Sequence, residues 1–302
     1  MRPQPMPTQD GADPATVWTT WHLHLASRAR SVYDRVLLEA VAPVVGARDR
    51  PWFFLRYWQG GPHVRLRVGD LDPAAQEEAE AELAGRLAQA GVLREGEEPV
   101  DPAAYREDAA RMVVTETIRP DGAEGVEELR PPGVYRAAYE PEFDRYGGVA
   151  FMPASERLFG LSSELALALL PHAPETQHRM MLAVRATVSA AAATGGPAEQ
   201  ERFYRGGLDF WRDWVAASSA LDAERIDRLC AMPAAGRTPD PGAHGPFGGW
   251  HEALAELAAR LAGAGRPPGP VLLSHVHMFC NRIGRSLIDE MQTYAWLVRT
   301  LG

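Results

Sequence analysis

The first ninety residues combine two hydrophobic patterns. Stretches in which polar and apolar residues alternate predict strands, and stretches with apolar residues three and four positions apart predict helices. The strands are expected at 17–25 and, as a pair joined by a Gly-Gly-Pro turn, within 52–68; the helices are expected at 31–45 and 72–90. The predicted order is therefore strand, helix, strand, strand, helix.

The pattern after residue 90 is weaker at first and then strongly helical. A short helix is expected at 101–111, a strand in the β-branched stretch 112–118, an acidic loop at 121–132 and a strand at 134–139. Helices are expected at 153–170, 175–193, 198–217, 222–229, 250–261 and, as one long helix or a helix pair, 271–301. A Pro/Gly-rich stretch at 232–248 predicts a mobile loop.

This order predicts an α+β fold, with a mostly antiparallel sheet and its helices first and a largely helical C-terminal half after it. Residues 1–15 are polar and proline-rich, which predicts a disordered tail. The rest is expected to form a single domain, sheet-rich at 16–150 and helical at 151–302.

Composition limits the function classes. The chain of 302 residues has a formal net charge of −9, which argues against a broad grip on nucleic acid. It contains no Lys, so all 31 basic residues are Arg, and chemistry that needs a Schiff-base or P-loop lysine is excluded. The N-terminus lacks the apolar core of a signal peptide, and no apolar run is long enough to span a membrane. A cytoplasmic protein is expected.

The pair Arg65 and Arg67 is the clearest candidate for chemistry. The two residues are separated by one position, so on a strand both guanidinium groups leave the same face. Two parallel arginines can clamp an anion, because each offers a planar fork of donors that keeps its charge. A solvated strand face with two surface arginines is the alternative, and the surrounding aromatic residues favour a pocket.

A second candidate is the stretch around His277. On a helix, His277, Cys280 and Asn281 share one face, and His275 points elsewhere. His277 can carry a proton near neutral pH, although a hydrogen-bonded core histidine would have the same pattern. The His-x-His-x-x-Cys spacing lacks a fourth ligand, so no metal is expected. Arg145 and Tyr146, in a polar turn before Gly147-Gly148, are either site residues or parts of that turn.

Three stretches together resemble a known family. The segments FFLRYWQGGPHVRLRV, YEPEFDRYGGVAFMPASERLFGLSSELALALL and SHVHMFCNRIG are similar, in this order, to the thiopeptide-type bacteriocin biosynthesis domain. That domain also forms the C-terminal, elimination portion of class I lantibiotic dehydratases. The resemblance extends from about Trp18 to Leu301, and the chain is similar to a separate, split member of the family.

The resemblance implies a reaction on a ribosomally made precursor peptide. A separate glutamylation subunit esterifies Ser or Thr with glutamate from glutamyl-tRNA, and the elimination domain removes the glutamate to leave dehydroalanine or dehydrobutyrine. No cofactor, metal or direct contact with nucleic acid is implied. The resemblance implies catalytic roles for Arg65, Arg67, Arg145 and His277. It implies substrate-binding or supporting roles for Arg56, Tyr57, His63, Tyr146, Asn281 and Arg282.

Two alternatives stay open. Pyridine synthases of the same family join two dehydroalanines in a formal [4+2] aza-cycloaddition and release the leader peptide as the macrocycle forms. A non-catalytic partner that only presents the peptide would have no need of the histidine. Because Arg65, Arg67, Arg145 and His277 occur together, elimination is the preferred hypothesis.

Overall fold

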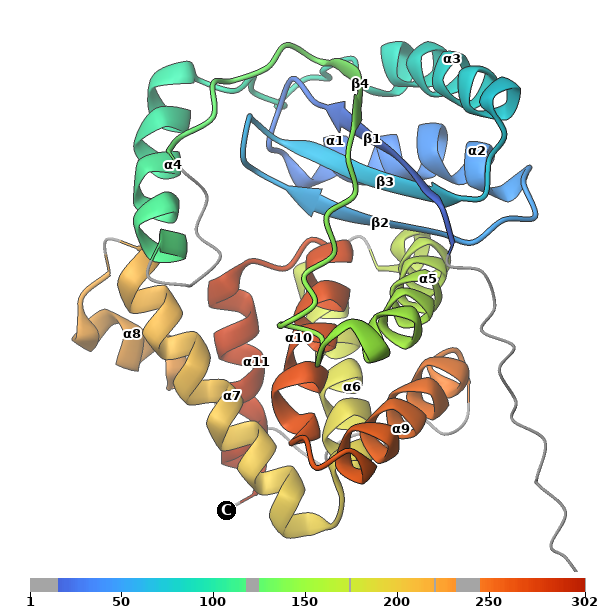
Figure 1. The fold of residues 1–302 in the computed structure, drawn as a ribbon. Coiled ribbons are helices and arrows are strands. Elements are labelled where there is room, and N and C mark those ends of the chain that lie inside the picture. Colours follow the sequence, from blue (N-terminus) through green and yellow to red (C-terminus); the bar gives the residue numbers. More distant parts are fainter. Residues whose placement is uncertain (1–15, 118–124, 174, 220, 232–244, 302) are drawn as a thin grey trace, which may run out of the picture.

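The computed structural model describes residues 16–117, 125–173, 175–219, 221–231 and 245–301. Figure 1 shows two layers, a four-stranded sheet with its own helices and a second layer of helices. The predicted α+β class is thereby confirmed. The expected tail at 1–15 and residues 232–244 of the expected mobile loop lie outside the described residues.

The sheet is antiparallel and has the strand order β2, β3, β1, β4. Its strands are β1 (Trp18–His24), β2 (Trp52–Tyr57), β3 (His63–Gly69) and β4 (Gly133–Ala137). The helices of the N-terminal half are α1 (Arg30–Val36), α2 (Ala42–Gly46), α3 (Pro73–Ala90) and α4 (Pro102–Thr117). All four predicted strand positions outside 112–118 are confirmed.

The second layer begins after β4. Its helices are α5 (Met152–Leu169), α6 (Thr176–Thr194), α7 (Pro197–Ser218), α8 (Ala223–Cys230), α9 (Gly248–Gly263), α10 (Pro268–Arg282) and α11 (Leu287–Thr300). The expected element at 271–301 is therefore a helix pair. Within the described residues, no helix has both the length and the apolar content needed to cross a bilayer.

One predicted element is wrong. The β-branched stretch 112–118 predicts a strand, but α4 continues from Pro102 through Thr117, and Ile118 lies outside the described residues. Valine and threonine lose only a few tenths of a kcal/mol, roughly, in a helix relative to better helix formers. A helix that has already started gains one hydrogen bond for each residue it adds, which outweighs this small preference.

The two faces of the sheet differ in character. Trp21, Leu23, Val64 and Leu66 point to one face and are buried in the main hydrophobic core, which also contains Leu83 of α3. Burial of each such side chain contributes about 1.5–3 kcal/mol. The opposite face carries polar and aromatic side chains, because side chains alternate along each strand. Its members include His22, His24, His63, Arg65 and Arg67.

The sheet joins the helical layer along β2, which is an edge strand. The side-chain amide of Asn281 accepts a hydrogen bond from the backbone N–H of Arg56 and donates one to its carbonyl, both at 2.8 Å. Ser163 Oγ accepts a hydrogen bond from the N–H of Phe54 at 3.1 Å. Polar side chains of α5 and α10 thus satisfy the free edge of β2 in place of a further strand.

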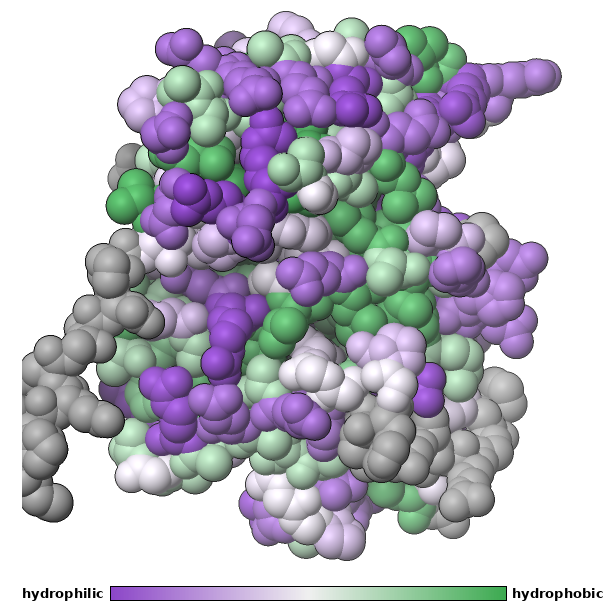
Figure 2. Space-filling view, turned by 90° about the vertical axis from the view of Figure 1, so that its right-hand side faces the viewer, coloured by the Kyte–Doolittle hydropathy of each residue, from purple (hydrophilic) through white to green (hydrophobic). Residues whose placement is uncertain are grey.

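The turn between α10 and α11 packs tightly against this junction. Gly284 has φ +71°, and a Cβ atom there would lie 2.8 Å from Arg56 Nη1. Glycine is therefore required for both its backbone conformation and the space. On the face in Figure 2, hydrophilic residues dominate the top, and hydrophobic residues gather at mid-height, where the two layers adjoin.

Candidate active site

Arg65 lies on the polar face of β3 and contacts two neighbouring side chains. Its guanidinium carbon lies 3.4 Å from the centroid of the Tyr57 ring, and its Nε–H donates to His63 Nε2 at 3.2 Å. Burial lowers the pKa of Arg65, and the charges of Tyr57 and Glu127 offset part of this effect. Arg65, Tyr57 and His63 therefore form one contact group.

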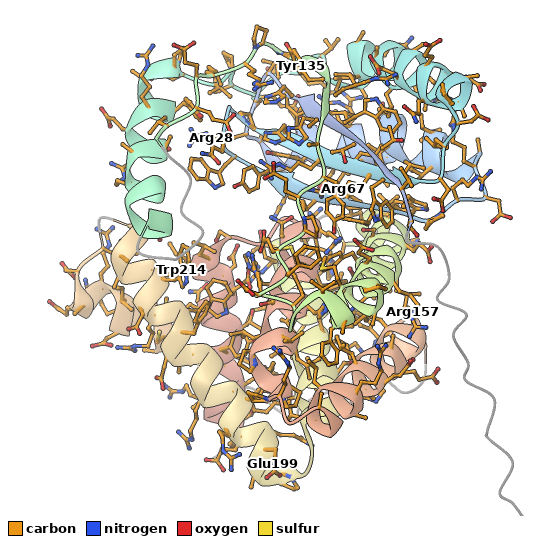
Figure 3. All side chains as sticks on the ribbon, viewed as in Figure 1. Arg28, Arg67, Tyr135, Arg157, Glu199 and Trp214 are labelled. Carbon is orange, nitrogen blue, oxygen red and sulfur yellow. The ribbon has the colours of Figure 1, made fainter. Side chains whose placement is uncertain are left out.

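Arg67 is buried and has unused hydrogen-bond donors. Only 6% of the residue is exposed, and among the described residues Nε and Nη1 have no hydrogen-bond partner. The guanidinium lies between the rings of Phe53 and Tyr139, 5.2 and 4.9 Å from their centroids. Burial lowers its pKa to about 10, so it is cationic at neutral pH. In Figure 3, Arg67 lies on the side of the sheet next to the helical layer.

Arg145 connects the turn after β4 to α10. Its Nη1 donates to Glu142 at 2.9 Å, and its Nε donates to Ser274 Oγ at 3.3 Å. Burial opposes the charge of Arg145, but nearby Tyr146, Glu142 and Glu290 outweigh it, so its pKa is raised. In Figure 1 the chain after β4 runs from the sheet to the helical layer, which allows one turn to reach both.

His277 of α10 is oriented by a buried carboxylate on α11. Its Nδ1 lies 2.8 Å from Glu290 Oε1, and only 1% of Glu290 is exposed. Burial raises the pKa of Glu290, while His277, Arg145 and Arg285 act to lower it. When Glu290 is ionised, Nδ1–H donates to it, and Nε2 is left as the basic nitrogen. The Trp211 ring packs 5.0 Å from the imidazole, between centroids.

The charges of two glutamates act on several of these groups. The carboxylate of Glu142 acts on the pKa of Arg65 and Arg67 as well as pairing with Arg145. The charge of Glu290 acts to raise the pKa of Arg145. Ser274, which accepts a hydrogen bond from Arg145, lies one helical turn before His277. Glu142 therefore interacts electrostatically with the three predicted arginines, and Glu290 interacts with Arg145 and His277.

Tyr146 is buried near these groups. It is 3% exposed, and its ring packs against Phe159 and His275 at centroid distances of 4.8 and 5.2 Å. Burial raises its pKa, and Arg145, Arg282 and Arg67 all act to lower it. A phenol with three guanidinium groups around it stays neutral at physiological pH and can donate a hydrogen bond.

Comparisons with known proteins identify the family. Residues 18–301 match the family model described as lantibiotic biosynthesis dehydratase, C-terminal. The chain belongs to this family. The resemblance of its sequence motifs is thereby confirmed. No curated protein matches the sequence.

Two solved structures share the fold of this lantibiotic dehydratase C-terminal domain. The pyridine synthase TbtD from thiomuracin biosynthesis is 20% identical with a TM-score of 0.62, and the match covers 94% of this chain and 99% of that one. The tRNA-dependent lantibiotic dehydratase MibB from Microbispora sp. 107891 is 19% identical with a TM-score of 0.57. That match covers 98% of this chain and only 28% of MibB.

Three other expected site residues have structural partners in this family member. Arg56 donates to Asp34 at 2.7 Å and to the Arg282 carbonyl at 3.0 Å, and Asn281 binds the β2 backbone. Arg282 is fully buried and donates to Ser163 Oγ at 2.8 Å, while burial lowers its pKa to about 9. These residues join the sheet to the helices.

The sequence motifs do not point to Glu290. Glu290 is separated from His277 by 13 residues and by the turn at Gly284, so only the packing of α10 on α11 brings the pair together. Glu142 belongs to the motif around Arg145 but looks like an ordinary residue of a polar turn. Its i, i+3 spacing from Arg145 is the one signal that predicts their ion pair.

Proposed function

We propose that this protein removes glutamate from glutamylated Ser or Thr residues of a precursor peptide, leaving dehydroalanine or dehydrobutyrine. The observation that carries the proposal is the carboxylate-oriented imidazole of His277, on the same helix whose Ser274 accepts a hydrogen bond from Arg145. Arg65 and Arg67 add fixed positive charge on the polar face of the sheet. A β-elimination needs a base beside fixed positive charge, and this arrangement supplies both.

The reaction assigns a role to each group. His277 Nε2 takes the α-proton of the esterified residue, and the electrons of the C–H bond form the new C=C bond as the Cβ–O bond breaks. Glutamate leaves as a carboxylate. Glu290 holds the imidazole in orientation and stabilises the imidazolium that forms. The proton then passes from His277 to solvent, which regenerates the base.

The arginines stabilise negative charge at two positions. During proton abstraction, charge builds up on the carbonyl oxygen next to the α-carbon, and the leaving carboxylate carries a further charge. Arg67 has unused donors for one of them. Arg145 can exchange Glu142 for a substrate carboxylate, because the Glu142 side chain is 56% exposed and can turn towards solvent.

The proposed reaction needs a glutamylated substrate. A separate glutamylation subunit would transfer glutamate from glutamyl-tRNA to the peptide, and this chain would act on the ester without contacting the tRNA. The cytoplasm, where glutamyl-tRNA is made, is the proposed location. The family match supports an action on a precursor peptide, and the chain spans 28% of the length of a tRNA-dependent dehydratase.

A direct test uses two peptides. The purified protein is incubated with a glutamylated peptide and, separately, with the fully dehydrated peptide, and products are measured by mass spectrometry. We expect loss of glutamate from the first and no change in the second. An unchanged glutamylated peptide, with a glutamylation subunit present or absent, would contradict the proposal and favour a role in presenting the peptide.

A second function is pyridine synthesis by [4+2] aza-cycloaddition. The observation that favours it is the near-complete mutual coverage with TbtD, which is named as a pyridine synthase. In the same experiment this function would consume the dehydrated peptide and release a leader fragment. Elimination remains the first proposal, because it uses the imidazole and all three guanidinium groups.

A further inference from the structure

Three histidines gather at the end of the polar sheet face nearest the Gly60-Gly61 turn. His22 and His24 leave β1 on the same side, and His63 of β3 lies directly across from His24 in the strand register. Ligand nitrogens of all three lie within 4.8 Å of one another. The proposed elimination uses His63 only through its contact with Arg65 and gives no role to His22 or His24.

The imidazoles are in the form that binds metal ions. Burial, followed by the charge of Arg65, lowers the pKa of His22 to about 3. Burial lowers the pKa of His24 and His63 to about 4 and about 2. Neutral imidazole offers a lone pair to a metal, whereas imidazolium has none.

Two of the rings have features of metal ligands. Nδ1–H of His63 donates to the Gly61 carbonyl at 2.8 Å, which leaves Nε2 as the lone-pair nitrogen. Metal-binding histidines commonly have their second nitrogen fixed by such a carbonyl. His24 is 2% exposed, and its Nδ1 has no hydrogen-bond partner among the described residues. A buried nitrogen without a partner is costly unless a ligand satisfies it.

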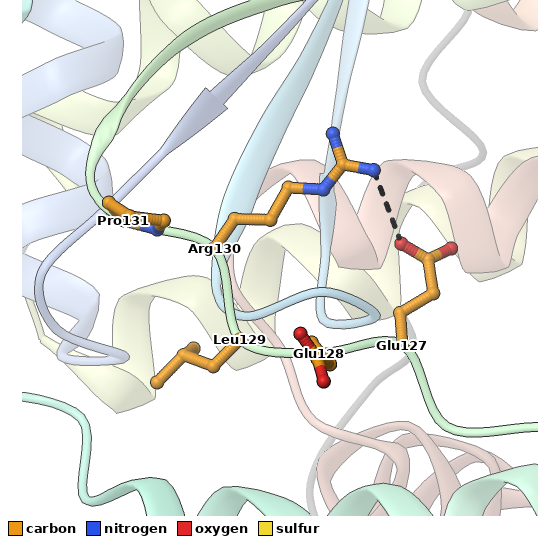
Figure 4. A pocket seen from close by; sticks show the side chains of 5 residues that line it. All are labelled: Glu127, Glu128, Leu129, Arg130 and Pro131. Atoms are coloured by element: carbon orange, nitrogen blue, oxygen red, sulfur yellow. Dashed lines mark ion pairs between the residues drawn. The ribbon is translucent and has the colours of Figure 1, made fainter.

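The charges around the cluster are mixed. Arg65, Arg67 and Arg130 act on His22 as positive neighbours. Glu127 supplies a carboxylate: a Cβ atom on Gly60 would lie 3.1 Å from Glu127 Oε2 and 3.4 Å from His24 Cε1. Arg130 pairs with Glu127 at 4.0 Å, and residues 127–131 line a recess of about 470 Å³ beside this turn (Figure 4).

We propose that His22, His24 and His63 bind one transition-metal ion of borderline softness, with Zn²⁺ as the expected occupant and Glu127 as a neighbouring carboxylate. Three imidazoles select Zn²⁺, Co²⁺ or Ni²⁺ over Mg²⁺ and Ca²⁺, which prefer oxygen. The His63 ring stacks on His22 and His24 at centroid distances of 4.8 and 4.4 Å, so side-chain rotation must aim the lone pairs at a common point.

Metal binding has a consequence for Arg65. His63 Nε2 accepts a hydrogen bond from Arg65 in the structure, and the same lone pair would bind the metal. A bound ion therefore releases Arg65 Nε–H from His63. The site does not rest on the proposed elimination, and it is tested by binding alone.

The test uses full-length protein without a histidine tag, stripped of metal by dialysis against a chelator. Zn²⁺ is titrated in competition with a chromophoric chelator, and Co²⁺ is added separately for its visible spectrum. We expect one ion per chain and tetrahedral Co²⁺ bands without a thiolate charge-transfer band, which separates this site from one at Cys230. His22→Gln and His24→Ala are expected to weaken binding by about 10- to 100-fold or more.

The matched control is His178→Ala, which removes an exposed histidine from α6 and is expected to bind the metal as the parent chain does. Circular dichroism checks that each variant is folded, and His22→Gln, at a partly exposed position, provides a second test if His24→Ala does not fold. No stoichiometric binding by the parent chain, equal binding by folded His22→Gln, or a thiolate band would each overturn the proposal.

Discussion

Nδ1 of His277 lies 2.8 Å from Oε1 of Glu290, although the two residues are on different helices. The imidazole is partly accessible, with 19% of its side chain exposed, and the carboxylate is buried. The imidazole is therefore within reach of a substrate, and the carboxylate that orients it lies inside the helical layer.

Replacement of His277 by Ala is expected to lower the rate of glutamate elimination by about 10²- to 10⁴-fold, the usual contribution of a general base. The reason is that no other described histidine is linked to Arg145 through a buried carboxylate. Single-turnover assays with a glutamylated peptide measure the effect. His178→Ala is the control, and a His277→Ala rate equal to that of the parent chain would exclude the base assignment.

Glu290→Gln tests the positioning role separately. The amide keeps the size of the side chain but removes the charge that stabilises the imidazolium. We expect kcat to fall by about 100-fold, within the range of up to about 10⁴ known for orienting carboxylates, with little change in KM. An increase in KM with unchanged kcat would show that Glu290 contributes to peptide binding instead.

The same buried carboxylate predicts a pH dependence of stability. Burial raises the pKa of Glu290 above its ordinary value of 4.5, so the folded chain binds this proton more tightly than the unfolded chain. The stabilisation is fully present below the unfolded pKa and is lost as pH rises through the folded pKa. At pH 7, Glu290→Gln should therefore unfold at a higher temperature than the parent chain, and the difference should vanish towards pH 4. A lower midpoint at pH 7 would contradict this prediction.

Much of the fold can be predicted from local pattern. The alternation around Arg65 and Arg67 predicts both the strand and the shared face of the two guanidinium groups, because side-chain direction in a strand depends only on position. The stretch 112–117 could not be assigned correctly, because its β-branched residues have a weak local preference that the preceding helix overrides.

The site is harder to predict than the fold. Asn281 and Arg56 are polar residues in the motifs, but their partners are the edge of β2 and Asp34, which only the packing of the layers reveals. Glu290 belongs to none of the motifs, and nothing near it in the sequence indicates that His277 is its partner. His22 and His24 alternate like other residues of a strand, and their proximity to His63 depends on the register of β1 with β3.

Two buried arginines should respond oppositely to the same substitution. Arg67 has unpartnered donors in an aromatic environment, so Arg67→Met is expected to raise the thermal midpoint while lowering activity by about 10²- to 10³-fold. Arg56 forms an ion pair with Asp34, so Arg56→Met should lower the free energy of unfolding by about 1–3 kcal/mol. The loss is limited because Asp34 still pairs with Arg179. Differential scanning calorimetry checks both, and destabilisation by Arg67→Met would indicate that its guanidinium has a structural role.

The amide of Asn281 provides the last test, because it separates a structural from a substrate-binding role. Asn281→Ala removes two hydrogen bonds from β2 and leaves the N–H and carbonyl of Arg56 unpaired, so we expect a loss of about 1–3 kcal/mol in unfolding free energy. Faster hydrogen exchange at the Arg56 amide should accompany it. Gln177→Ala, at an exposed position on α6, is the control. Unchanged stability and exchange with a raised KM for the peptide would instead assign Asn281 to substrate binding, as the family motif implies.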